Sequence, residues 1–578
     1  MNVLLTAINA KYIHSNLAVY SLQAYAREHG QYASIAEFTI NHRVEEILNE
    51  LYMRKPDVLC FSCYIWNIEY VKELSAEFHK LCPQTPIWLG GPEVSFETET
   101  FLKENPSVTG IIIGEGEEAF YRLCAYYDRE GFMEEIDGIA WRRENGEICI
   151  QPQKKLLPLD EIPFCYQDLE RFENRIIYYE SGRGCPFSCT YCLSSVDKQL
   201  RLRSLELVYR ELQYFLDQRA AQVKFVDRTF NCDHEHAMGI WKYIKDHDNG
   251  VTNFHFEISA DLLNEQELKL LSQMRPGLVQ FEIGVQTTNF ETLREIRRSM
   301  SIGRLEDAVL RIHKGRNIHQ HLDLIAGLPY ENYDSFQKSF DEVYALKPQQ
   351  LQLGFLKVLK GSFLYENAEE YRLVYRDKPP YEVMETRWIS YGEMLRIKLV
   401  EEMLEIHYNS GQFVTTLAVL ERIFESPFEM YLRLAAFYGE NGVLHQKMTR
   451  LARSEVLLKF ASGIDPDFRE LYEETLLYDL YIRENVKKRP EWAKDLYVYR
   501  VWIQKSLHEK GYQSKYCHLE PFFYPVREID VRQNLDYERL MKKADAPMWV
   551  LFDYENRDAW TKEADIMWIR STWTDDTE

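Results

Sequence analysis

Three cysteines set close together constrain this chain more than any other sequence feature. Cys185, Cys189 and Cys192 lie in the stretch CPFSCTYC. Since the chain has only 11 cysteines in 578 residues, this spacing seldom arises by chance. Three thiolates on one short loop can bind three corners of a cubane iron–sulfur cluster. One iron then has no protein ligand, so it can bind a substrate or a cofactor.

A structural zinc loop is the main alternative for these cysteines. A closed zinc site needs a fourth ligand at short spacing, usually from a second Cys or His pair. After Cys192 no such residue follows until Cys232 and His234, so the spacing favours an iron–sulfur cluster. A second C-x2-C pair, Cys60 and Cys63, lies in a strand-like run without a partner pair, and we interpret both as small buried apolar residues.

The spacing C-x3-C-x2-C, with an aromatic residue before the last cysteine, resembles the signature of the radical S-adenosylmethionine (SAM) enzymes. The resemblance implies that Cys185, Cys189 and Cys192 are catalytic and hold a 4Fe-4S cluster. It also implies that the open iron chelates SAM and that one electron from the cluster cleaves SAM to a 5′-deoxyadenosyl radical. An electron donor such as flavodoxin or ferredoxin is then an expected partner.

Length, charge and the N-terminal sequence limit the class of protein. A chain of 578 residues predicts three or four domains at about 150 residues each. The formal net charge of −22 does not favour nucleic acid as a partner. The start MNVLLTAINA has no basic segment before its apolar residues, and no apolar run reaches membrane-spanning length. An odd number of cysteines fits a reducing compartment, so we expect a cytoplasmic protein without a membrane partner.

Residues 1–128 are predicted to form an α/β domain with a doubly wound, Rossmann-like sheet. Strand-like runs alternate here with helical stretches, which is typical of parallel sheets. The strand-like runs are residues 3–8, 35–40, 58–63, 87–89 and 111–113. Ligands of such sheets bind beyond the carboxyl ends of the strands.

Glycines follow two of these strands, as Gly90-Gly91 and as Gly114-Glu115-Gly116. Glycine allows a bulky ligand to approach the backbone closely. Placed before the cysteine motif, these loops resemble the cobalamin-binding domain at the N-terminus of one radical SAM subclass, the class B type. The resemblance implies the following cobalamin contacts: His14, Tyr64, Trp66, Gly90, Gly91, Gly114, Glu115 and Gly116.

The axial ligand of cobalt is left open by the sequence. The commonest cobalamin pattern is D-x-H-x-x-G, whereas the matching segment at residues 9–14 reads NAKYIH. In one alternative no protein nitrogen binds cobalt, and Tyr64, Trp66 or neighbouring loop residues cover the lower face of the corrin. In another alternative His14 is the ligand. A third role for His14 is that of a hydrogen-bonding loop residue.

Residues 129–170 are predicted to be a hairpin, turning at Asn145-Gly146, and a linker. Residues 171–370 are predicted to form a partial (β/α)6 barrel. Its strand-like runs are residues 176–180, 223–227, 254–258, 279–284, 322–326 and 351–358. Catalytic groups of barrels lie at the carboxyl ends of the strands, and the cysteine loop directly follows the first run.

Polar residues at later strand ends are candidates for SAM contacts. The phrases EIGVQT and DLIAGLP resemble recurrent radical SAM segments, and Arg298 is preferred over Arg297 by its spacing from Gln286. Tyr191 is expected to pack on adenine or on the barrel wall. For the polar residues, a salt bridge or a helix cap is the alternative role. The predicted SAM contacts are Tyr191, Asp227, Glu257, Gln286, Arg298 and Asp323.

Residues 371–578 are predicted to be mainly α-helical, with two short strands near residues 549–554 and 566–569. We interpret the many aromatic residues here as core. Some cobalamin-type radical SAM proteins carry a similar added C-terminal helical domain of unassigned role.

The resemblance implies a function for the whole chain. A radical SAM enzyme with a 4Fe-4S cluster, SAM and cobalamin is expected to methylate an unactivated carbon of an unknown substrate. A first alternative keeps the cofactors but catalyses a rearrangement or cyclisation without methylation. Methylthiolation needs an additional cysteine triad, which Cys60, Cys63 and Cys82 do not convincingly make. A zinc-stabilised interaction protein is the alternative without enzymatic activity.

Overall fold

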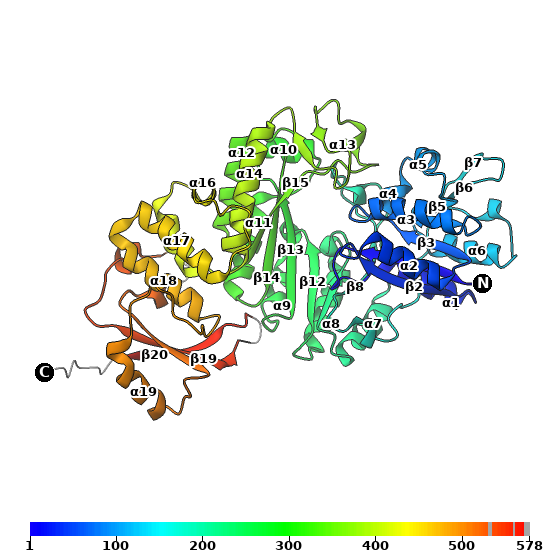
Figure 1. Ribbon diagram of the computed structural model, residues 1–578. Coiled ribbons are helices and arrows are strands. Elements are labelled where there is room, and N and C mark those ends of the chain that lie inside the picture. The colour runs from blue at the N-terminus through cyan, green and yellow to red at the C-terminus, as the bar shows by residue number, and fades with distance from the viewer. Residues whose placement is uncertain (530–534, 559–560, 571–578) are drawn as a thin grey trace. The chain divides into compact units, whose positions relative to one another are not determined.

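The computed structural model describes residues 1–529, 535–558 and 561–570 (Figure 1). The chain divides into two compact units. The first unit comprises Met1–His319, Ile325–Asn332 and Gly354–Ser390. The second unit comprises Gln320–Leu324, Tyr333–Leu353 and the described residues from Tyr391 onward.

The first unit begins with a seven-stranded sheet, called the first sheet, in the order β2-β1-β3-β4-β5-β6-β7. Its strands are β1 (Val3–Asn9), β2 (Ala33–Thr39), β3 (Val58–Ser62), β4 (Ile87–Gly90), β5 (Gly110–Ile112), β6 (Ile139–Arg142) and β7 (Ile148–Gln151). The five N-terminal strands pair in parallel, and β6 and β7 extend the sheet by antiparallel pairing. The hairpin predicted from Asn145-Gly146 is therefore part of this sheet.

Helices cover both faces of the first sheet. They are α1 (Leu17–Glu28), α2 (Val44–Arg54), α3 (Ile68–Leu81), α4 (Pro92–Ser95), α5 (Thr98–Glu104) and α6 (Glu117–Tyr127). Side chains of β1 alternate between two cores, because successive strand residues point to opposite faces. Leu4 and Ile8 pack with Leu74 of α3, whereas Val3 and Leu5 pack in a separate core. The predicted doubly wound α/β fold is confirmed.

Cys60 and Cys63 are buried in different places. Cys60 belongs to the core that contains Val3, and Cys63 belongs to the core that contains Leu4. The two thiols therefore lie on opposite faces of the first sheet, so they cannot share a metal ion. Burial raises the pKa of both thiols. The interpretation of both residues as buried apolar side chains is confirmed.

A six-stranded sheet, called the second sheet, has the order β15-β14-β13-β12-β11-β8. Its strands are β8 (Ile177–Tyr179), β11 (Gln222–Phe225), β12 (Asn253–Ile258), β13 (Val279–Gln286), β14 (His319–Ala326) and β15 (Gln350–Phe355). The strands from β8 to β13 pair in parallel. Helices α7 (Leu205–Asp217), α8 (His234–Asp246) and α9 (Glu265–Leu271) follow β8, β11 and β12 in the sequence. The predicted partial (β/α)6 barrel is confirmed.

The two sheets are joined within the first unit by the segment before β8. Ile176 forms a parallel bridge with His14, and its amide donates to the Ile13 carbonyl at 2.8 Å. The Ser15 hydroxyl donates to the Ile176 carbonyl at 3.0 Å. These bonds place the loop after β1 next to the first strand of the second sheet.

The second unit is mainly helical from Tyr391 onward. Its longer helices are α14 (Tyr391–Leu404), α15 (Val414–Leu420), α16 (Pro427–Glu440), α17 (Arg450–Ile464), α18 (Arg469–Tyr481) and α19 (Arg500–Glu509). The strands β18 (Cys517–Phe522), β19 (Met548–Arg557) and β20 (Ala564–Arg570) form an antiparallel sheet. Two of them were predicted, whereas β18, which contains Pro521, was not. Tyr431, Tyr472 and Trp549 are fully buried, so these aromatic side chains are core, as predicted.

The described helices and the surface agree with the composition. None of these helices has both the length and the apolar character needed to cross a bilayer.

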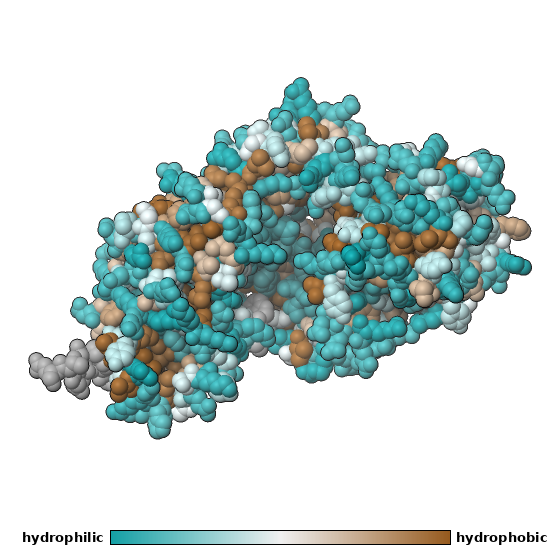
Figure 2. Space-filling model, in the orientation of Figure 1, coloured by the Kyte–Doolittle hydropathy of each residue, from teal (hydrophilic) through white to brown (hydrophobic). Residues whose placement is uncertain are grey.

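All 11 cysteines are free thiols. Figure 2 shows a face that is mostly hydrophilic with hydrophobic residues scattered over it, as expected for a chain with 28% charged residues.

Candidate functional site

The three motif cysteines lie on the loop that follows β9 (Gly182–Arg183). Cys185 and Cys189 are each 8% exposed, and Cys192 is half-buried. The Cys185 amide donates to the Asp197 carbonyl at 3.0 Å, and the Thr190 amide donates to the Ile296 carbonyl at 3.0 Å. The cysteine loop is therefore fixed by backbone bonds at its beginning and at its middle.

Arg298, a predicted SAM contact, lies beside the cysteine loop. Its Nη1 is 3.9 Å from Cys189 Sγ and 3.4 Å from the Tyr191 hydroxyl, and its Nη2 donates to the Gly284 carbonyl. Burial raises the pKa of the Cys189 thiol, and the cation of Arg298 offsets part of this effect. Tyr191 packs against a cluster of buried apolar residues.

The sulfur donors fit an iron–sulfur cluster in kind and in position. Three cysteines of one loop supply the soft ligands that such clusters prefer, two of them in a buried setting. Among the described residues no three His, Cys, Asp or Glu side chains are already arranged as metal ligands. The assignment of Cys185, Cys189 and Cys192 as cluster ligands stays a prediction.

Gln286 ends β13 with an unusual backbone. Its φ is +71°, a left-handed value that residues other than glycine rarely adopt. Its Oε1 is buried without a hydrogen-bond partner, and Nε of Arg298 is also buried without one. A Cβ atom at Gly284 would lie 2.3 Å from Gln286 Nε2, so a side chain at residue 284 would collide with this amide. The free acceptor and the free donor fit a polar ligand at this strand end.

Asp227 follows β11, and a serine satisfies its carboxylate. The Ser181 amide and hydroxyl donate to it at 3.0 and 2.7 Å. His236 Nε2 lies 3.2 Å from the same hydroxyl. Burial raises the pKa of Asp227 to about 7, although the bonds from Ser181 oppose this effect. These bonds favour a structural role over the predicted SAM contact.

Replacing Asp227 by Asn is expected to change the pH dependence of folding. The folded-state pKa of about 7 lies above the ordinary value of 3.8, so the wild type loses stability as the pH rises from 3.8 to about 7. Asn does not titrate. The stability of the variant relative to the wild type should therefore rise over this range, by at most about 4 kcal/mol. Urea unfolding at several pH values measures this, and parallel curves for the two proteins would contradict it.

The two other predicted acidic SAM contacts lie in different units. Glu257, near the end of β12, has Oε1 3.6 Å from Lys224 Nζ. Asp323 lies on the part of β14 that belongs to the second unit, with Oδ1 3.1 Å from His321 Nε2. Glu257 therefore has the ion pair of the alternative role, Asp323 has a histidine neighbour, and the SAM contacts of both side chains stay predictions.

The first unit contains a cavity of about 800 Å³ at the carboxyl ends of β1, β3, β4 and β5. Its lining includes all eight residues predicted to contact cobalamin: His14, Tyr64, Trp66, Gly90, Gly91, Gly114, Glu115 and Gly116. The second sheet and its loops contribute Tyr178, Glu180, Arg183, Lys224, Arg228 and Glu257. This volume is at the upper end of the range of about 300–1,000 Å³ that is typical of small-molecule sites.

Tyr64 and Trp66 form a flat aromatic surface in this cavity. Their rings are parallel within 3°, with centroids 4.5 Å apart. The Trp66 indole nitrogen donates to the Ile8 carbonyl at 3.0 Å, which fixes the ring, while 40% of the residue is exposed. The buried Asn67 side chain holds the same loop through the carbonyls of Ile8 and Ser62. A planar macrocycle such as a corrin fits against a surface of this kind.

His14 lines the cavity and is held by a neighbour. Its Nδ1 lies 2.5 Å from the Tyr178 hydroxyl of β8. Burial lowers the pKa of His14, and the cations of Lys11 and Lys224 lower it further. A neutral imidazole with one nitrogen in a hydrogen bond accords with the role of a hydrogen-bonding loop residue. Ligation of cobalt by His14 stays a prediction.

Glycine is favoured at two of the cavity positions by the backbone conformation and, at Gly91, also by packing against backbone. Gly91 has a φ of +120°, and a Cβ atom there would lie 2.4 Å from the Cys63 carbonyl oxygen. Gly114 has a φ of +74°, and its Cβ atom would lie 2.6 Å from Gln153 Oε1. These glycines let the loops after β4 and β5 turn sharply at the edge of the cavity.

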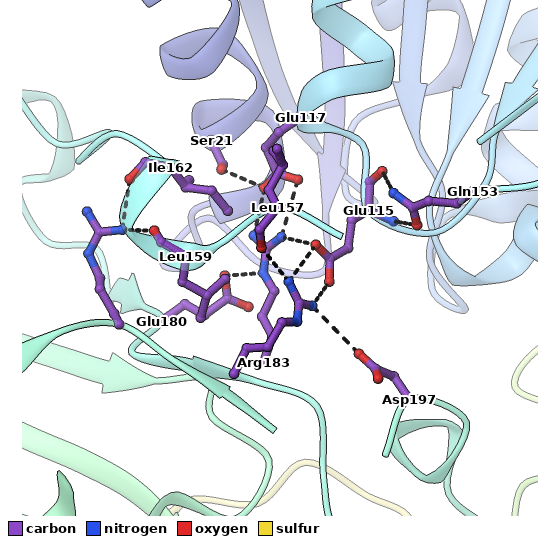
Figure 3. Close-up of polar contacts among 12 residues, drawn as sticks. Ser21, Glu115, Glu117, Gln153, Leu157, Leu159, Ile162, Glu180, Arg183 and Asp197 are labelled. Carbon is purple, nitrogen blue, oxygen red and sulfur yellow. Dashed lines mark hydrogen bonds and ion pairs between the residues drawn. The ribbon is translucent and has the colours of Figure 1, made fainter. Parts of the chain in front are cut away.

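Sequence reasoning missed an ion network that lines the same cavity (Figure 3). Glu115, whose contact with cobalamin stays a prediction, pairs its carboxylate with Arg183 at 3.1 Å and with Arg201. Arg183 also contacts Glu117 and Glu180. In the sequence, only the position of Arg183 just before the cysteine motif could have indicated a functional role for this residue.

Three families match parts of the chain. They are the B12 binding domain over residues 3–124, the Radical SAM superfamily over residues 179–343, and a family described as a protein of unknown function (DUF4080) over residues 369–552. The first match covers the strands that line the cavity, and the second covers the cysteine loop. The third covers most of the helical C-terminal region.

Several curated proteins are similar to this chain. An uncharacterized methyltransferase of Pyrococcus horikoshii is 26% identical over 290 residues, which are 48% of this chain and 62% of that protein. The cobalamin-dependent radical SAM methyltransferase TokK of Streptomyces tokunonensis is 25% identical over 348 residues, 55% of this chain and 50% of TokK. An anaerobic magnesium-protoporphyrin IX monomethyl ester cyclase of Synechocystis sp. is 21% identical over 342 residues, 56% of this chain and 67% of the cyclase. The chain thus spans less than two thirds of both methyltransferases.

Solved structures share the fold. The cobalamin-dependent SAM radical enzyme OxsB, with aqua-cobalamin and SAM bound, aligns with a TM-score of 0.58 at 15% identity and covers 89% of this chain and 82% of its own. The radical SAM methyltransferase TsrM of Kitasatospora setae, with cobalamin and a [4Fe-4S] cluster bound, has a TM-score of 0.53 at 17% identity and covers 66% and 79%. A B12-binding domain thus precedes a radical SAM domain in one chain. This protein therefore belongs to the cobalamin-binding radical SAM enzymes, whose cofactors are a 4Fe-4S cluster, SAM and cobalamin.

Proposed function

We propose that this protein is a C-methyltransferase that acts on an unactivated carbon of a substrate still to be identified. One observation carries the proposal. A single cavity is lined both by the strand ends of the B12-binding domain and by residues of the second sheet, near the cysteine loop. Such a cavity can hold a corrinoid and a substrate next to each other. Methyltransferases among the similar proteins support the reaction class.

The residues divide into three groups by the cofactor that they would hold. When bound, the cluster and SAM supply a 5′-deoxyadenosyl radical, and cobalamin supplies the methyl group. Cys185, Cys189 and Cys192 would hold the cluster. The contacts proposed for SAM within the first unit are Tyr191, Glu257, Gln286 and Arg298, with Asp227 assigned a structural role. Asp323, in the second unit, is kept only as a candidate from the sequence. The contacts proposed for cobalamin are the eight residues that line the cavity.

The protein's own contribution is to position the reacting groups. The Tyr64–Trp66 stack offers a flat face to the corrin, and its fixed rings limit movement of a planar ligand. Arg298 offers a cation and Gln286 an acceptor beside the cysteine loop, and these groups would suit the carboxylate and the ammonium group of SAM. Holding the reacting groups in line in this way lowers the entropic part of the barrier.

Cyclisation without methylation is the second candidate function. The similarity to anaerobic magnesium-protoporphyrin IX monomethyl ester cyclases favours it, since three such proteins match. The two functions differ in their products. Methylation adds a methyl group to the substrate and consumes a second SAM, whereas cyclisation does neither, so mass spectrometry of the product distinguishes them.

The proposal also concerns partners and the compartment. The cluster needs one electron for each cleavage of SAM, so we propose flavodoxin or ferredoxin as donor. Oxygen-sensitive clusters and free thiols are compatible with a reducing compartment, and all 11 cysteines here are free. We infer the cytoplasm on this ground.

Reconstitution with hydroxocobalamin under anaerobic conditions tests the cofactor set. We expect a brown protein that keeps about one equivalent of corrinoid after desalting, together with iron and sulfide in the ratio of a 4Fe-4S cluster. A colourless preparation that holds zinc would instead indicate the metal-stabilised interaction protein.

Replacing Trp66 by Ala is expected to weaken corrinoid binding by about tenfold, or about 1.4 kcal/mol, because one ring of the stacked surface is lost. Equilibrium dialysis against hydroxocobalamin measures this. Tyr32→Ala is the control, since Tyr32 is an exposed aromatic residue, 73% accessible, that does not line the cavity. Equal corrinoid affinity in the two variants would show that the stack does not contact the ligand.

A further inference from the structure

Arg183 is the centre of a largely buried ion network, here called the Arg183 network, which also contains Glu115, Glu117 and Glu180 (Figure 3). The guanidinium uses each of its nitrogens. Nε donates to Glu180 at 2.8 Å, Nη1 donates to Glu115 at 3.1 Å and to Glu117 at 3.2 Å, and Nη2 donates to Glu117 at 2.6 Å. A planar guanidinium that bonds three carboxylates has little freedom to rotate.

The network is shielded from water, so its contacts are strong. The side chains of Arg183 and Glu117 are 15% and 5% exposed. Burial disfavours the charged form of Glu117, but attraction and hydrogen bonding to Arg183 outweigh this and lower its pKa. Removing one partner of a buried pair leaves an uncompensated charge, which is far more costly than losing a surface pair.

The three carboxylates come from two different domains. Glu115 lies in the loop after β5, and Glu117 is the first residue of α6, both within the B12-binding domain. Glu180 follows β8 of the second sheet, and Arg183 lies two residues before Cys185. All four side chains line the cavity. One guanidinium therefore connects the loop proposed to contact cobalamin with the loop proposed to hold the cluster.

Neighbouring bonds stiffen this connection. Arg201 of β10 (Arg201–Leu202) pairs with Arg183 of β9, contacts Glu115, and donates to the Leu157 carbonyl of the linker at 2.7 Å. The Ser21 hydroxyl of α1 donates to Glu117 at 2.9 Å. Movement of the loop after β5 would thus have to break bonds to the cysteine loop, to the linker and to α1.

Another ion pair between the two sheets provides a comparison. Arg175 Nη1 contacts Glu37 at 2.8 Å, with 15% and 11% of the side chains exposed. Arg175 precedes β8, whereas Arg183 follows it, and neither Arg175 nor Glu37 lines the cavity. This pair has similar burial to the Arg183 network but is not part of the cavity or of the cysteine loop.

We propose that Arg183 is a positioning residue that sets the distance between the corrinoid and the iron–sulfur cluster. The inference rests on the proposed function, because it requires both cofactors in one chain. Arg183 itself need not touch either cofactor. Its effect follows from the bonds that hold the loop after β5 and the start of the cysteine loop in one fixed arrangement.

The test compares Arg183→Gln with Arg175→Gln in the anaerobic holoenzyme. Hydroxocobalamin affinity, iron content and thermal unfolding are measured, and electron paramagnetic resonance of cob(II)alamin beside the reduced cluster reports their spacing. For Arg183→Gln we expect about tenfold weaker corrinoid binding and an altered spin–spin interaction, with iron content and SAM cleavage within about twofold of wild type. For Arg175→Gln we expect the wild-type spectrum and corrinoid affinity, with a lower unfolding temperature.

A merely structural role makes a different prediction. In that case the folded fraction of Arg183→Gln would keep the wild-type corrinoid affinity and spin–spin interaction and lose only thermal stability, which would overturn the inference. If Arg183→Gln does not fold, Arg183→Lys replaces it. Lysine keeps the positive charge among the three carboxylates but lacks the planar fork that bonds all of them. The same altered spin–spin interaction is expected, and a wild-type spectrum would again overturn the inference.

Failure of the proposed function gives a distinct result. Wild-type protein that binds no corrinoid after reconstitution would contradict the proposed function, and the inference with it. Wild-type protein that binds both cofactors, together with an unaffected Arg183→Gln holoenzyme, would contradict the inference alone.

Discussion

Replacing Cys185, Cys189 and Cys192 together by Ala is expected to abolish iron binding and the cleavage of SAM to 5′-deoxyadenosine. These thiols are the soft ligands on the loop after β9, and without them the second sheet offers no comparable set. We expect iron content to fall from about four atoms per chain to near zero. Iron analysis and chromatography of 5′-deoxyadenosine, under dithionite reduction, measure both effects.

Cys232→Ala is the matched control for this triple variant. Cys232 lies in the short helix after β11, is partly buried, and lies close enough to Cys185 to be affected by its charge, but it is outside the motif. We expect this variant to keep its cluster and its SAM cleavage. Retained production of 5′-deoxyadenosine by the triple variant, or its loss in Cys232→Ala, would contradict the assignment of the ligands.

Much of the fold and one part of the site follow from local sequence patterns. The apolar run of β1 and the alternation of apolar residues in β13 both predict strands, and β1 is buried throughout whereas β13 is buried at every second residue. The eight residues predicted to contact cobalamin line one cavity because the carboxyl ends of parallel strands meet at the same edge of a sheet. The prediction rested on the order of these loops before the cysteine motif and on their resemblance to the cobalamin-binding domain of one radical SAM subclass.

Contacts between distant segments could not be read from the sequence. Arg183 and Glu117 are 66 residues apart, and neither stands in a pattern that indicates its partner. Asp227 follows a strand, which made it a reasonable candidate for SAM, yet two bonds from Ser181, 46 residues earlier, satisfy its carboxylate. A carboxylate at a strand end looks the same in sequence whether a ligand or a neighbouring loop binds it.

The backbone conformation of single residues also could not be predicted from sequence patterns. Gln286 has a left-handed φ and a buried acceptor without a partner, and Arg298 has a buried donor without one. Similarly, β18 escaped prediction because Pro521 and Glu520 do not favour strands. Glu520 is tolerated there because Arg489 bonds both of its oxygens at 2.6 Å. Long-range pairing, rather than local propensity, decides these positions.

Replacing Gly184 by Ala is expected to displace the cysteine loop and lower the iron content by half or more. Gly184 precedes Cys185 with a φ of +86°, and a Cβ atom there would lie 2.2 Å from the Gln199 carbonyl oxygen. Since that atom belongs to the backbone, the loop itself has to move. We expect about 1–2 kcal/mol of destabilisation from the left-handed backbone and about 1–3 kcal/mol more from overpacking.

Gly146→Ala separates these two effects, because Gly146 has nearly the same φ, +84°, with no atom within 4 Å of the added Cβ. It lies in the turn between β6 and β7, away from the cysteines in sequence. We expect this control to lose only the backbone contribution and to keep a full complement of iron. Chemical unfolding and iron analysis of both variants measure the difference. Equal losses of stability and equal iron content would mean that the packing of Gly184 against Gln199 does not hold the cysteine loop in place.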